Sequence, residues 1–414
     1  MWDLGWSGLQ SDPQAPILDP RSPIPARPLV AALQILDPRA LMPCSVEQNR
    51  MHRALELAAR GRGLVEPNPM VGCVLWRDGA VVGEGWHRRF GGPHAEIEAL
   101  EAAGSRAEGA TMYVTLEPCC HQGKTPACSD AVIRSGVRRV IVALADPFPE
   151  VSGGGLARLR EAGIDVEAGL LEAESRTLNA PYLTRLELGR PWMIAKWAMT
   201  LDGKIATPSG DSRWISGSRS RSIVHDLRGR VDAVMIGSNT ARIDDPLLTA
   251  RPPGTRTATR IVVDRRASLP LESQLVRTLA EAPVMVAAGD DAAEKDVARL
   301  TAAGCEVYCC EGETHEQRLR SLLAELGRRD MTNVLVEGGG LLLATLHRIG
   351  CVDEVHAFIA PKLVGSTAAA PMMDGGDSQP QQDAVCMADV AQLHNVTIEP
   401  LGRDVYIHGR LRRP

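Results

Sequence analysis

The chain of 414 residues is long enough for two ordinary domains and a tail. Its net charge of −5 lacks the basic excess of proteins that bind nucleic acid through phosphates, which favours a small-molecule substrate. It contains no apolar run of about eighteen residues, so we expect no membrane-spanning helix and no membrane partner. Ten irregularly spaced cysteines and the lack of a secretory signal indicate a reduced, cytoplasmic protein.

The first part of the chain, residues 1–46, differs in composition from the rest. Prolines interrupt every potential helix there, and no lasting apolar periodicity is present. The segment lacks the basic start and long apolar core of a signal peptide, and its acidic residues argue against a transit peptide. We therefore expect a Pro-rich, disordered extension. A start codon assigned too early is the alternative, because Met51 opens a regular helical pattern.

Strand and helix patterns alternate through residues 47–189 and predict a three-layer α/β domain. Asp78 and Gly79 are typical of a tight turn that joins the two strands of a hairpin. The expected elements are helices at 47–60, at 94–103, after 128 and after a glycine-rich turn at 153–155, and strands at 71–76, 81–85, 112–116, 137–143 and 164–167.

A second α/β unit follows in residues 190–412. Its apolar strands have helices between them, which is typical of a doubly wound sheet. The last part of the chain returns to short strands. The expected strands of this unit are 193–198, 232–237, 260–264, 284–287, 333–337, 354–360 and 405–409.

A metal-binding motif crosses the first of these domains. His94 and Glu96 form a His-x-Glu pair, and Cys119 follows a proline and precedes Cys128. This combination is typical of zinc-dependent nucleobase deaminases. One imidazole and two thiolates leave a fourth zinc position for a water whose pKa the ion lowers. We therefore predict His94, Cys119 and Cys128 as zinc ligands at helix N-termini, and Glu96 as the catalytic proton carrier.

The spacing within this motif leaves two alternatives. The usual Cys-x-x-Cys is replaced by a longer insert, and Cys120 is a rival first ligand; Cys119 is preferred because it directly follows the proline. A closed structural zinc site would need a fourth protein ligand and would leave Glu96 without a role. The insert carries His121 and Lys124, polar groups suited to an anionic substrate.

Glycine-rich turns follow strands in the second unit, at residues 237–240 and 337–340. Glycines between a strand and a helix allow a phosphate to approach the backbone, and the helix N-terminus favours its charge. The Gly-x-Gly-x-x-Gly fingerprint is absent, so these turns give only modest support for an anion or nucleotide site. The motifs of this half also offer no obvious proton donor.

With these motifs in view, the chain resembles the bifunctional deaminase–reductases of riboflavin biosynthesis. Residues 66–72, 94–96 and 118–128 resemble the deaminase half, including the long insert between the cysteines. The resemblance covers roughly residues 47–411, in the order of the family. The motifs that resemble the reductase half are residues 201–207, 214–216, 244–246 and 337–339.

The resemblance implies a cytidine-deaminase-like domain at 47–189 and a dihydrofolate-reductase-like domain at 190–412. The first would use zinc to remove the 2-amino group of 2,5-diamino-6-ribosylamino-4(3H)-pyrimidinone 5′-phosphate as ammonia. The second would use NADPH to reduce the ribosyl group to ribityl, giving 5-amino-6-(ribitylamino)uracil 5′-phosphate. An iminium form of the ribose accepting hydride at C1′ would need little acid catalysis. A homodimer or homotetramer is also implied.

The family's binding positions map onto individual residues of this chain. Arg228 and Arg251 would act as phosphate clamps, since a guanidinium binds phosphate bidentately. The cofactor positions correspond to Ala198, Trp214, Thr240, Asp244 and Gly339. The substrate positions correspond to Asn68, His87, His121 and Lys124 in the deaminase, and to Ser212, Arg228, Leu248, Arg251 and Glu337 in the reductase.

The chain also departs from the family at named positions. Phe148 stands where an asparagine is common, so any contact of that asparagine is lost or replaced, and Cys120 stands where a serine is usual.

Two other functions compete with the bifunctional enzyme. A deaminase of free or polymeric cytosine or adenine would leave the second half unexplained. A non-enzymatic binding protein would leave Glu96 unexplained.

Overall fold

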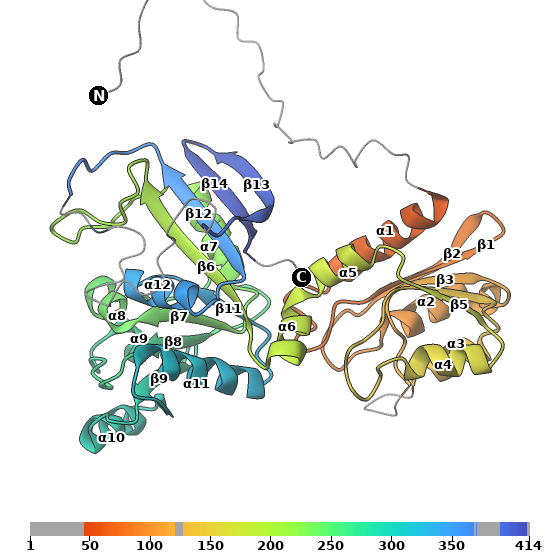
Figure 1. Cartoon of the computed structure of the whole chain (residues 1–414), viewed down its shortest axis with the longest axis horizontal. Coiled ribbons are helices and arrows are strands. Elements are labelled where there is room, and N and C mark those ends of the chain that lie inside the picture. The colour runs from red at the N-terminus through yellow and green to blue at the C-terminus, as the bar shows by residue number, and fades with distance from the viewer. Residues whose placement is uncertain (1–44, 121–126, 368–369, 371–389, 412–414) are drawn as a thin grey trace, which may run out of the picture. The chain divides into compact units, whose positions relative to one another are not determined.

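The computed structural model describes residues 45–120, 127–367, 370 and 390–411, which form two α/β domains (Figure 1). The predicted Pro-rich extension lies almost entirely outside these residues. The first helix, α1 (Val46–Ala59), begins one residue earlier than predicted because Ser45 caps it. The Ser45 hydroxyl accepts a hydrogen bond from the Gln48 backbone at 3.2 Å, and the Gln48 side chain accepts one from the Ser45 backbone at 2.8 Å.

The first domain is built around a mixed five-stranded sheet in the order β2-β1-β3-β4-β5. The contacts of β3, β4 and β5 are parallel, and β1 pairs antiparallel with β2 and β3. Helices α1 and α5 cover one face, and α2, α3 and α4 cover the other (Figure 1). The predicted three-layer domain is thereby confirmed. Besides α1, the elements are β1 (Gly72–Arg77), β2 (Ala80–Trp86), α2 (Ala95–Ala103), η2 (Gly104–Ala107), β3 (Thr111–Leu116), α3 (Cys128–Arg134), β4 (Arg139–Leu144), α4 (Gly154–Glu161), β5 (Asp165–Ala168), α5 (Glu172–Leu178) and α6 (Ala180–Leu188).

The second domain contains a nine-stranded sheet in the order β10-β9-β8-β7-β11-β6-β12-β14-β13. The contacts from β10 to β12 are parallel, whereas β14 and β13 are antiparallel. Helices α11 and α12 pack on one face, and α7, α8, α9 and α10 on the other, as expected for a doubly wound sheet. The elements are β6 (Trp192–Thr200), α7 (Ser218–Arg228), β7 (Ala233–Gly237), α8 (Ser238–Asp244), β8 (Thr259–Val263), α9 (Gln274–Arg277), β9 (Val284–Gly289), α10 (Glu294–Ala302), β10 (Glu306–Cys310), α11 (His315–Arg328), β11 (Asn333–Val336), α12 (Gly340–Arg348), β12 (Glu354–Ala360), β13 (His394–Leu401) and β14 (Asp404–Arg410).

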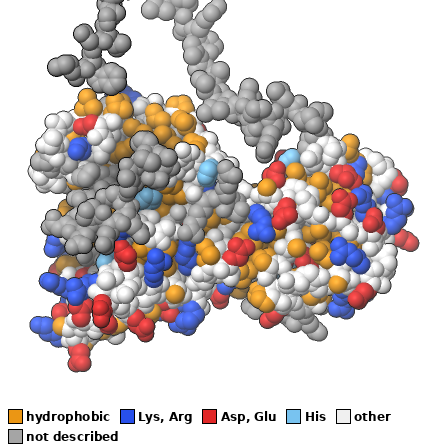
Figure 2. Space-filling view, in the orientation of Figure 1, with side chains coloured by type: hydrophobic (Ala, Val, Ile, Leu, Met, Phe, Trp, Pro, Cys, Tyr) orange, Lys and Arg blue, Asp and Glu red, His pale blue; other side chains and the backbone are white. Residues whose placement is uncertain are grey.

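The distribution of charged side chains on the surface agrees with the small net charge of the chain. On the face drawn in Figure 2, acidic and basic side chains are interspersed and form no extended basic patch. No helix among the described residues is both long enough and apolar enough to span a bilayer.

A buried ion pair joins Arg190, at the start of the second domain, to Asp353, the residue before β12. Arg190 contacts both carboxylate oxygens of Asp353, at 2.6 and 2.8 Å, and the Asp353 carboxylate also accepts the backbone N–H of Met193. The Asp353 side chain is 1% exposed. Removing one partner leaves an uncompensated charge in the interior, which costs far more than losing an exposed pair.

We therefore expect Asp353→Ala to lower the free energy of unfolding by about 3–5 kcal/mol. The matched control is Glu316→Gln, whose carboxylate pairs with Arg348 but is 43% exposed, and this change should cost about 1 kcal/mol or less. Urea unfolding followed by circular dichroism would measure both values. Equal losses for the two variants would contradict the buried pair's role.

Candidate active sites

The three predicted zinc ligands converge in the first domain. His94 is the N-cap of α2, Cys128 is the first residue of α3, and Cys119 lies in the irregular segment after β3. Their ligand atoms all lie within 4.8 Å of one another; the His94 Nδ1 is 3.2 Å from the Cys128 Sγ and 3.7 Å from the Cys119 Sγ. The prediction that all three lie at helix N-termini is wrong for Cys119.

The thiols of Cys119 and Cys128 lie close enough to shift each other's pKa. The hydrogen bond from Cys128 lowers the pKa of Cys119 to about 4, and the same bond raises the pKa of Cys128. The backbone N–H of Cys128 also donates to the Cys119 Sγ at 3.3 Å. A thiolate, a second thiol and an imidazole nitrogen within bonding reach of one point are the donor set that zinc prefers. The residues present therefore fit a zinc ion.

Glu96 lies directly beside this cluster, in the first turn of α2. Its side chain is buried, and burial raises the pKa of its carboxyl group. Glu96, His94 and Cys119 all line a cavity of about 310 Å³. Among the described residues, the metal cluster offers three protein ligands and faces this cavity. That is the open arrangement of a catalytic zinc site, and it gives no support to a closed structural site.

The rival ligand Cys120 points away from the metal cluster. Its thiol lies 3.6 Å from the carbonyl oxygen of Glu150 and 3.9 Å from that of Val151, in the segment before α4. Glu117 holds this segment in place, although the sequence analysis did not identify it. Its buried carboxylate accepts backbone N–H groups of residues 146, 153, 155 and 156 at 2.9–3.2 Å. The proline and Glu117 thus direct Cys119, and not Cys120, toward His94.

Two predicted substrate residues, Asn68 and His87, line the same cavity, and the His87 ring lies 5.4 Å from the His94 ring. His87 donates through Nδ1 to the carbonyl oxygen of Pro93 at 2.9 Å, so its Nε2 can accept from the Asn68 amide at 3.3 Å. Burial lowers the pKa of His87, which favours this neutral form. Both residues line the cavity. The other two predicted contacts, His121 and Lys124, lie outside the described residues.

Phe148 takes part in the same cavity. It lines the wall together with Asp146 and Tyr182, and the Tyr182 hydroxyl donates to Asp146 at 3.1 Å. The structure therefore has an apolar ring in the position where the family commonly has an asparagine. Tyr182 comes from α6, an element that the sequence analysis did not predict.

The second domain contains a larger cavity, of about 590 Å³, at the carboxyl ends of β6, β7 and β11. Ligand sites in open α/β sheets are typically found at this edge. All predicted reductase positions line it, although they come from six separate segments of the chain. These positions are Ala198, Ser212, Trp214, Arg228, Thr240, Asp244, Leu248, Arg251, Glu337 and Gly339.

A buried charge cluster forms the floor of this cavity. Glu337 forms a bidentate ion pair with Arg228, and the Lys196 ammonium lies 3.7 Å from the Glu337 carboxylate. The Glu337 carboxylate is thus shared by two cations. The prediction that Arg228 clamps a phosphate stays a prediction; its guanidinium is already paired with Glu337, whereas Arg251 is exposed at the cavity wall.

Lys196 was not identified by the sequence analysis. It lies on β6, two residues before Ala198, and burial lowers the pKa of its ammonium. Its only sequence signal is that it interrupts an apolar strand with a charge. A buried ammonium with a lowered pKa can donate a proton more readily than an ordinary lysine.

The glycine turn after β11 lines the same cavity. Gly338 and Gly339 have φ angles of 144° and 88°, which side chains other than glycine rarely adopt. A Cβ atom at Gly338 would lie 3.4 Å from the Thr240 side chain. The backbone of this turn therefore lies close to Thr240 on α8. A turn without side chains also allows a phosphate-bearing ligand to approach the main chain.

Fold and sites together define a two-domain enzyme in which a zinc-dependent deaminase domain precedes a reductase domain. Residues 44–144 match the cytidine and deoxycytidylate deaminase zinc-binding region, and residues 191–407 match the RibD C-terminal domain. The chain belongs to the RibD family of riboflavin biosynthesis proteins.

Relatives and solved structures agree over most of the chain. The riboflavin biosynthesis protein RibD of Actinobacillus pleuropneumoniae is 39% identical over 357 residues, covering 86% of this chain and 93% of that protein. RibD of Escherichia coli K12 is 38% identical over 371 residues, covering 86% and 97%. The structure of Acinetobacter baumannii RibD is 34% identical with a TM-score of 0.76, covering 88% of this chain and 98% of that one. A Thermotoga maritima diaminohydroxyphosphoribosylaminopyrimidine deaminase/5-amino-6-(5-phosphoribosylamino)uracil reductase is 34% identical, with a TM-score of 0.74 and the same coverage.

These findings confirm the predicted family, the fold class and the pair of activities. The cytidine-deaminase-like domain and the reductase domain of dihydrofolate-reductase type are both present. Zinc and NADPH are the cofactors of these two domains. The roles assigned to individual residues stay predictions.

Proposed function

We propose that this chain catalyses two successive steps on one phosphorylated pyrimidine, with residues 47–189 as the deaminase and residues 190–412 as the reductase. The substrate is 2,5-diamino-6-ribosylamino-4(3H)-pyrimidinone 5′-phosphate, and the product is 5-amino-6-(ribitylamino)uracil 5′-phosphate. The observation that carries the proposal is the convergence of His94, Cys119 and Cys128 beside Glu96 at an open cavity. A cytoplasmic location is part of the proposal, since no disulfide joins any two of the described cysteines.

In the deaminase, the chain's residues would hold the metal and move protons. A bound zinc ion supplies Lewis-acid activation of a water molecule. Glu96 would take a proton from that water, deliver protons to the ring nitrogen and the departing amine, and so release ammonia. Asn68 and His87 would orient the pyrimidine, because their side chains form one fixed pair at the cavity wall.

In the reductase, we assign two groups of residues to the shared cavity. Ser212, Arg228, Leu248, Arg251 and Glu337 would bind the phosphorylated substrate, with Arg251 at its phosphate. NADPH supplies the hydride when bound. The residues assigned to it are Ala198, Trp214, Thr240, Asp244 and Gly339.

The test is to supply the purified protein with the diaminopyrimidine ribosyl phosphate and NADPH. Ammonia release and NADPH oxidation should both occur, and zinc should be bound. Ammonia without NADPH oxidation would restrict the activity to the first domain. Neither product, with zinc bound, would favour the binding-protein alternative over the enzyme.

We also propose that the chain forms a homo-oligomer through β13 and β14. These strands end the nine-stranded sheet, and exposed apolar side chains gather on one face of their hairpin. Val396, Ile398 and Val405 are 46%, 59% and 39% exposed. An unpaired edge strand with apolar side chains favours pairing with another chain. A second copy offers the same surface and could pair symmetrically.

Ile398→Lys is therefore expected to shift the protein toward the monomer. The lysine would place a charge within the apolar patch, where a partner copy would have to desolvate it. Sedimentation velocity would measure the mass of wild type and variant, and Val46→Lys, at an exposed position on α1, is the control. An unchanged mass for Ile398→Lys would exclude this surface as the interface.

A further inference from the structure

A third cavity lies between the two domains and shares no lining residue with the two active-site cavities. It has a volume of about 270 Å³. The segment after α1 and helices α5 and α6 form one wall, and strands β6, β12 and β14 form the other. The charged residues on these walls include Arg62, Glu66, Arg230, Glu354 and Arg410.

Three arginines on these walls have no carboxylate partner. Arg62 belongs to the first domain, and Arg230 and Arg410 to the second; none forms an ion pair within 4.0 Å with a described residue. Burial lowers the pKa of both Arg230 and Arg410, and repulsion by Arg62 lowers it further. Placing two partly buried arginines close to a third positive charge is costly unless an anion compensates them.

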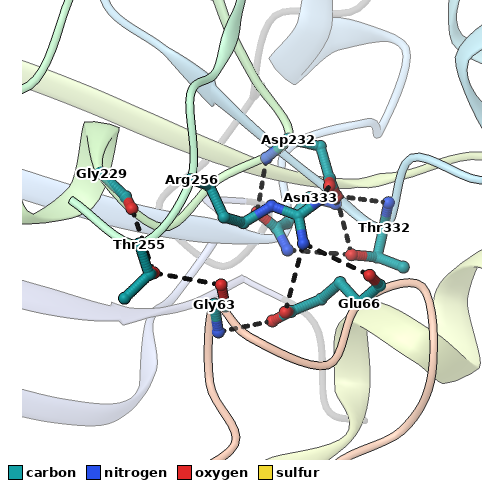
Figure 3. Close-up of polar contacts among 8 residues, drawn as sticks. All are labelled: Gly63, Glu66, Gly229, Asp232, Thr255, Arg256, Thr332 and Asn333. Carbon is teal, nitrogen blue, oxygen red and sulfur yellow. Dashed lines mark hydrogen bonds and ion pairs between the residues drawn. The ribbon is translucent and has the colours of Figure 1, made fainter. Parts of the chain in front are cut away.

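The two carboxylates that line the cavity are engaged elsewhere. Glu66 accepts the backbone N–H of Gly63 at 2.9 Å and pairs with Arg256 at 3.7 Å (Figure 3). Glu354 accepts from the Trp192 indole at 3.0 Å and contacts the His356 ring at 2.8 Å. Glu354 attracts Arg230 and Arg410 electrostatically, but neither acid forms an ion pair within 4.0 Å with any of the three arginines. The Glu66 Oε2 also has no hydrogen-bond partner among the described residues.

Two side-chain nitrogen atoms on the second-domain wall also lack hydrogen-bond partners. The Arg410 Nη1 and the His408 Nδ1 are buried without a hydrogen-bond partner among the described residues. The Arg410 guanidinium lies over the Trp192 ring, 5.1 Å from its centre, which fixes its plane. Buried unsatisfied donors are rare and costly, so an external acceptor is expected here.

We propose that this third cavity binds a phosphate group, either as inorganic phosphate or on a small phosphorylated metabolite. Guanidinium groups recognise phosphate oxygens bidentately, and three of them surround the space. The volume lies at the lower end of the range of about 300–1,000 Å³ that is usual for ligand pockets, which favours a small anion. Because the arginines come from both domains, the bound anion stabilises the contact between them.

The test is calorimetric titration of the full-length protein with inorganic phosphate and, separately, with ribose 5-phosphate. Arg410→Gln and Arg62→Gln should each weaken one binding event by at least about tenfold. Arg62 is exposed, so its replacement leaves the fold intact. Arg403→Gln, at an exposed turn outside all three cavities, is the matched control and should bind as wild type does. Arg251→Gln should remove a different event, at the reductase cavity.

Crystals soaked in phosphate give the second readout, with density expected beside Arg62 and Arg410. If both ligands bind equally, the phosphate group alone is recognised; if only ribose 5-phosphate binds, the ligand is a phosphorylated metabolite. Wild-type affinities in both Arg62→Gln and Arg410→Gln, together with an empty cavity in the soaked crystals, would overturn the proposal.

Discussion

Replacing Glu96 with Gln is expected to lower the rate of ammonia release by about 10²–10⁴-fold while zinc remains bound. The glutamine side chain would keep the size and burial of Glu96 but could neither take up nor deliver a proton. The ligands His94, Cys119 and Cys128 are untouched, so metal content should equal that of wild type. The reductase cavity shares no residue with this site, so reduction of the deaminated intermediate should continue.

The matched control is Glu98→Gln, which is also in the first turn of α2 but does not line the cavity. Glu98 pairs with exposed Arg88, so its loss should leave ammonia release near the wild-type rate. Ammonia assays and zinc analysis on both variants would decide the matter. A Glu96→Gln variant that keeps zinc and most of its deaminase activity would remove Glu96 from the catalytic role.

The deaminase site could be predicted because its proposed metal ligands and catalytic acid occur in short sequence motifs. His94 and Glu96 are two residues apart, and a proline marks Cys119 as the first cysteine of the pair. A metal needs a fixed set of donor atoms, so few sequences can satisfy it by chance. The choice between Cys119 and Cys120 needed the structure, because it depends on the backbone held by Glu117.

The reductase site was harder to predict from the sequence alone. Its residues come from six separate strands, helices and loops, and only the resemblance to the family grouped them before the structure brought them to one cavity. The third cavity had no sequence signal. Its arginines, Arg62, Arg230 and Arg410, lie in three distant segments, and no sequence motif connects them.

The fold was predictable wherever strands are apolar and buried on both faces. The core strands β7, β8, β9 and β11 have nearly continuous apolar sequences and were all expected. The missed strands, β10 and β13, pair at sheet edges and are partly exposed, so their sequences lack this pattern. Helix α5 was missed because it buries only Ser175 and has no apolar face.

Lys196→Met is expected to lower the reductase kcat by about 10²-fold or more and leave deamination unchanged. Conversion of ribosyl to ribityl breaks the C1′–O4′ bond, and O4′ must gain a proton as the ring opens. Lys196 carries its ammonium into the reductase cavity, 3.7 Å from Glu337, and can supply that proton. The sequence motifs offered no such donor. Methionine preserves the length of the side chain and removes the charge.

The pH dependence of kcat can distinguish a loss of general-acid catalysis by Lys196 from a loss of side-chain packing. A general acid acts only in its protonated form, so the rate should fall as pH rises through the pKa of Lys196. Burial lowers that pKa, so the fall should begin below the pH at which an ordinary lysine, with a pKa of about 10.4, loses its proton. The fall should be absent from the residual activity of Lys196→Met.

The matched control is Lys295→Met, at an exposed position on α10, which should behave as wild type does. The deaminated intermediate with saturating NADPH isolates the second step, and kcat and KM are measured separately. A change in KM alone would make Lys196 a binding residue that holds Glu337 in place. An unchanged kcat with the wild-type pH profile would exclude it as the acid. Either result would leave the iminium route without acid assistance, as the sequence motifs first indicated.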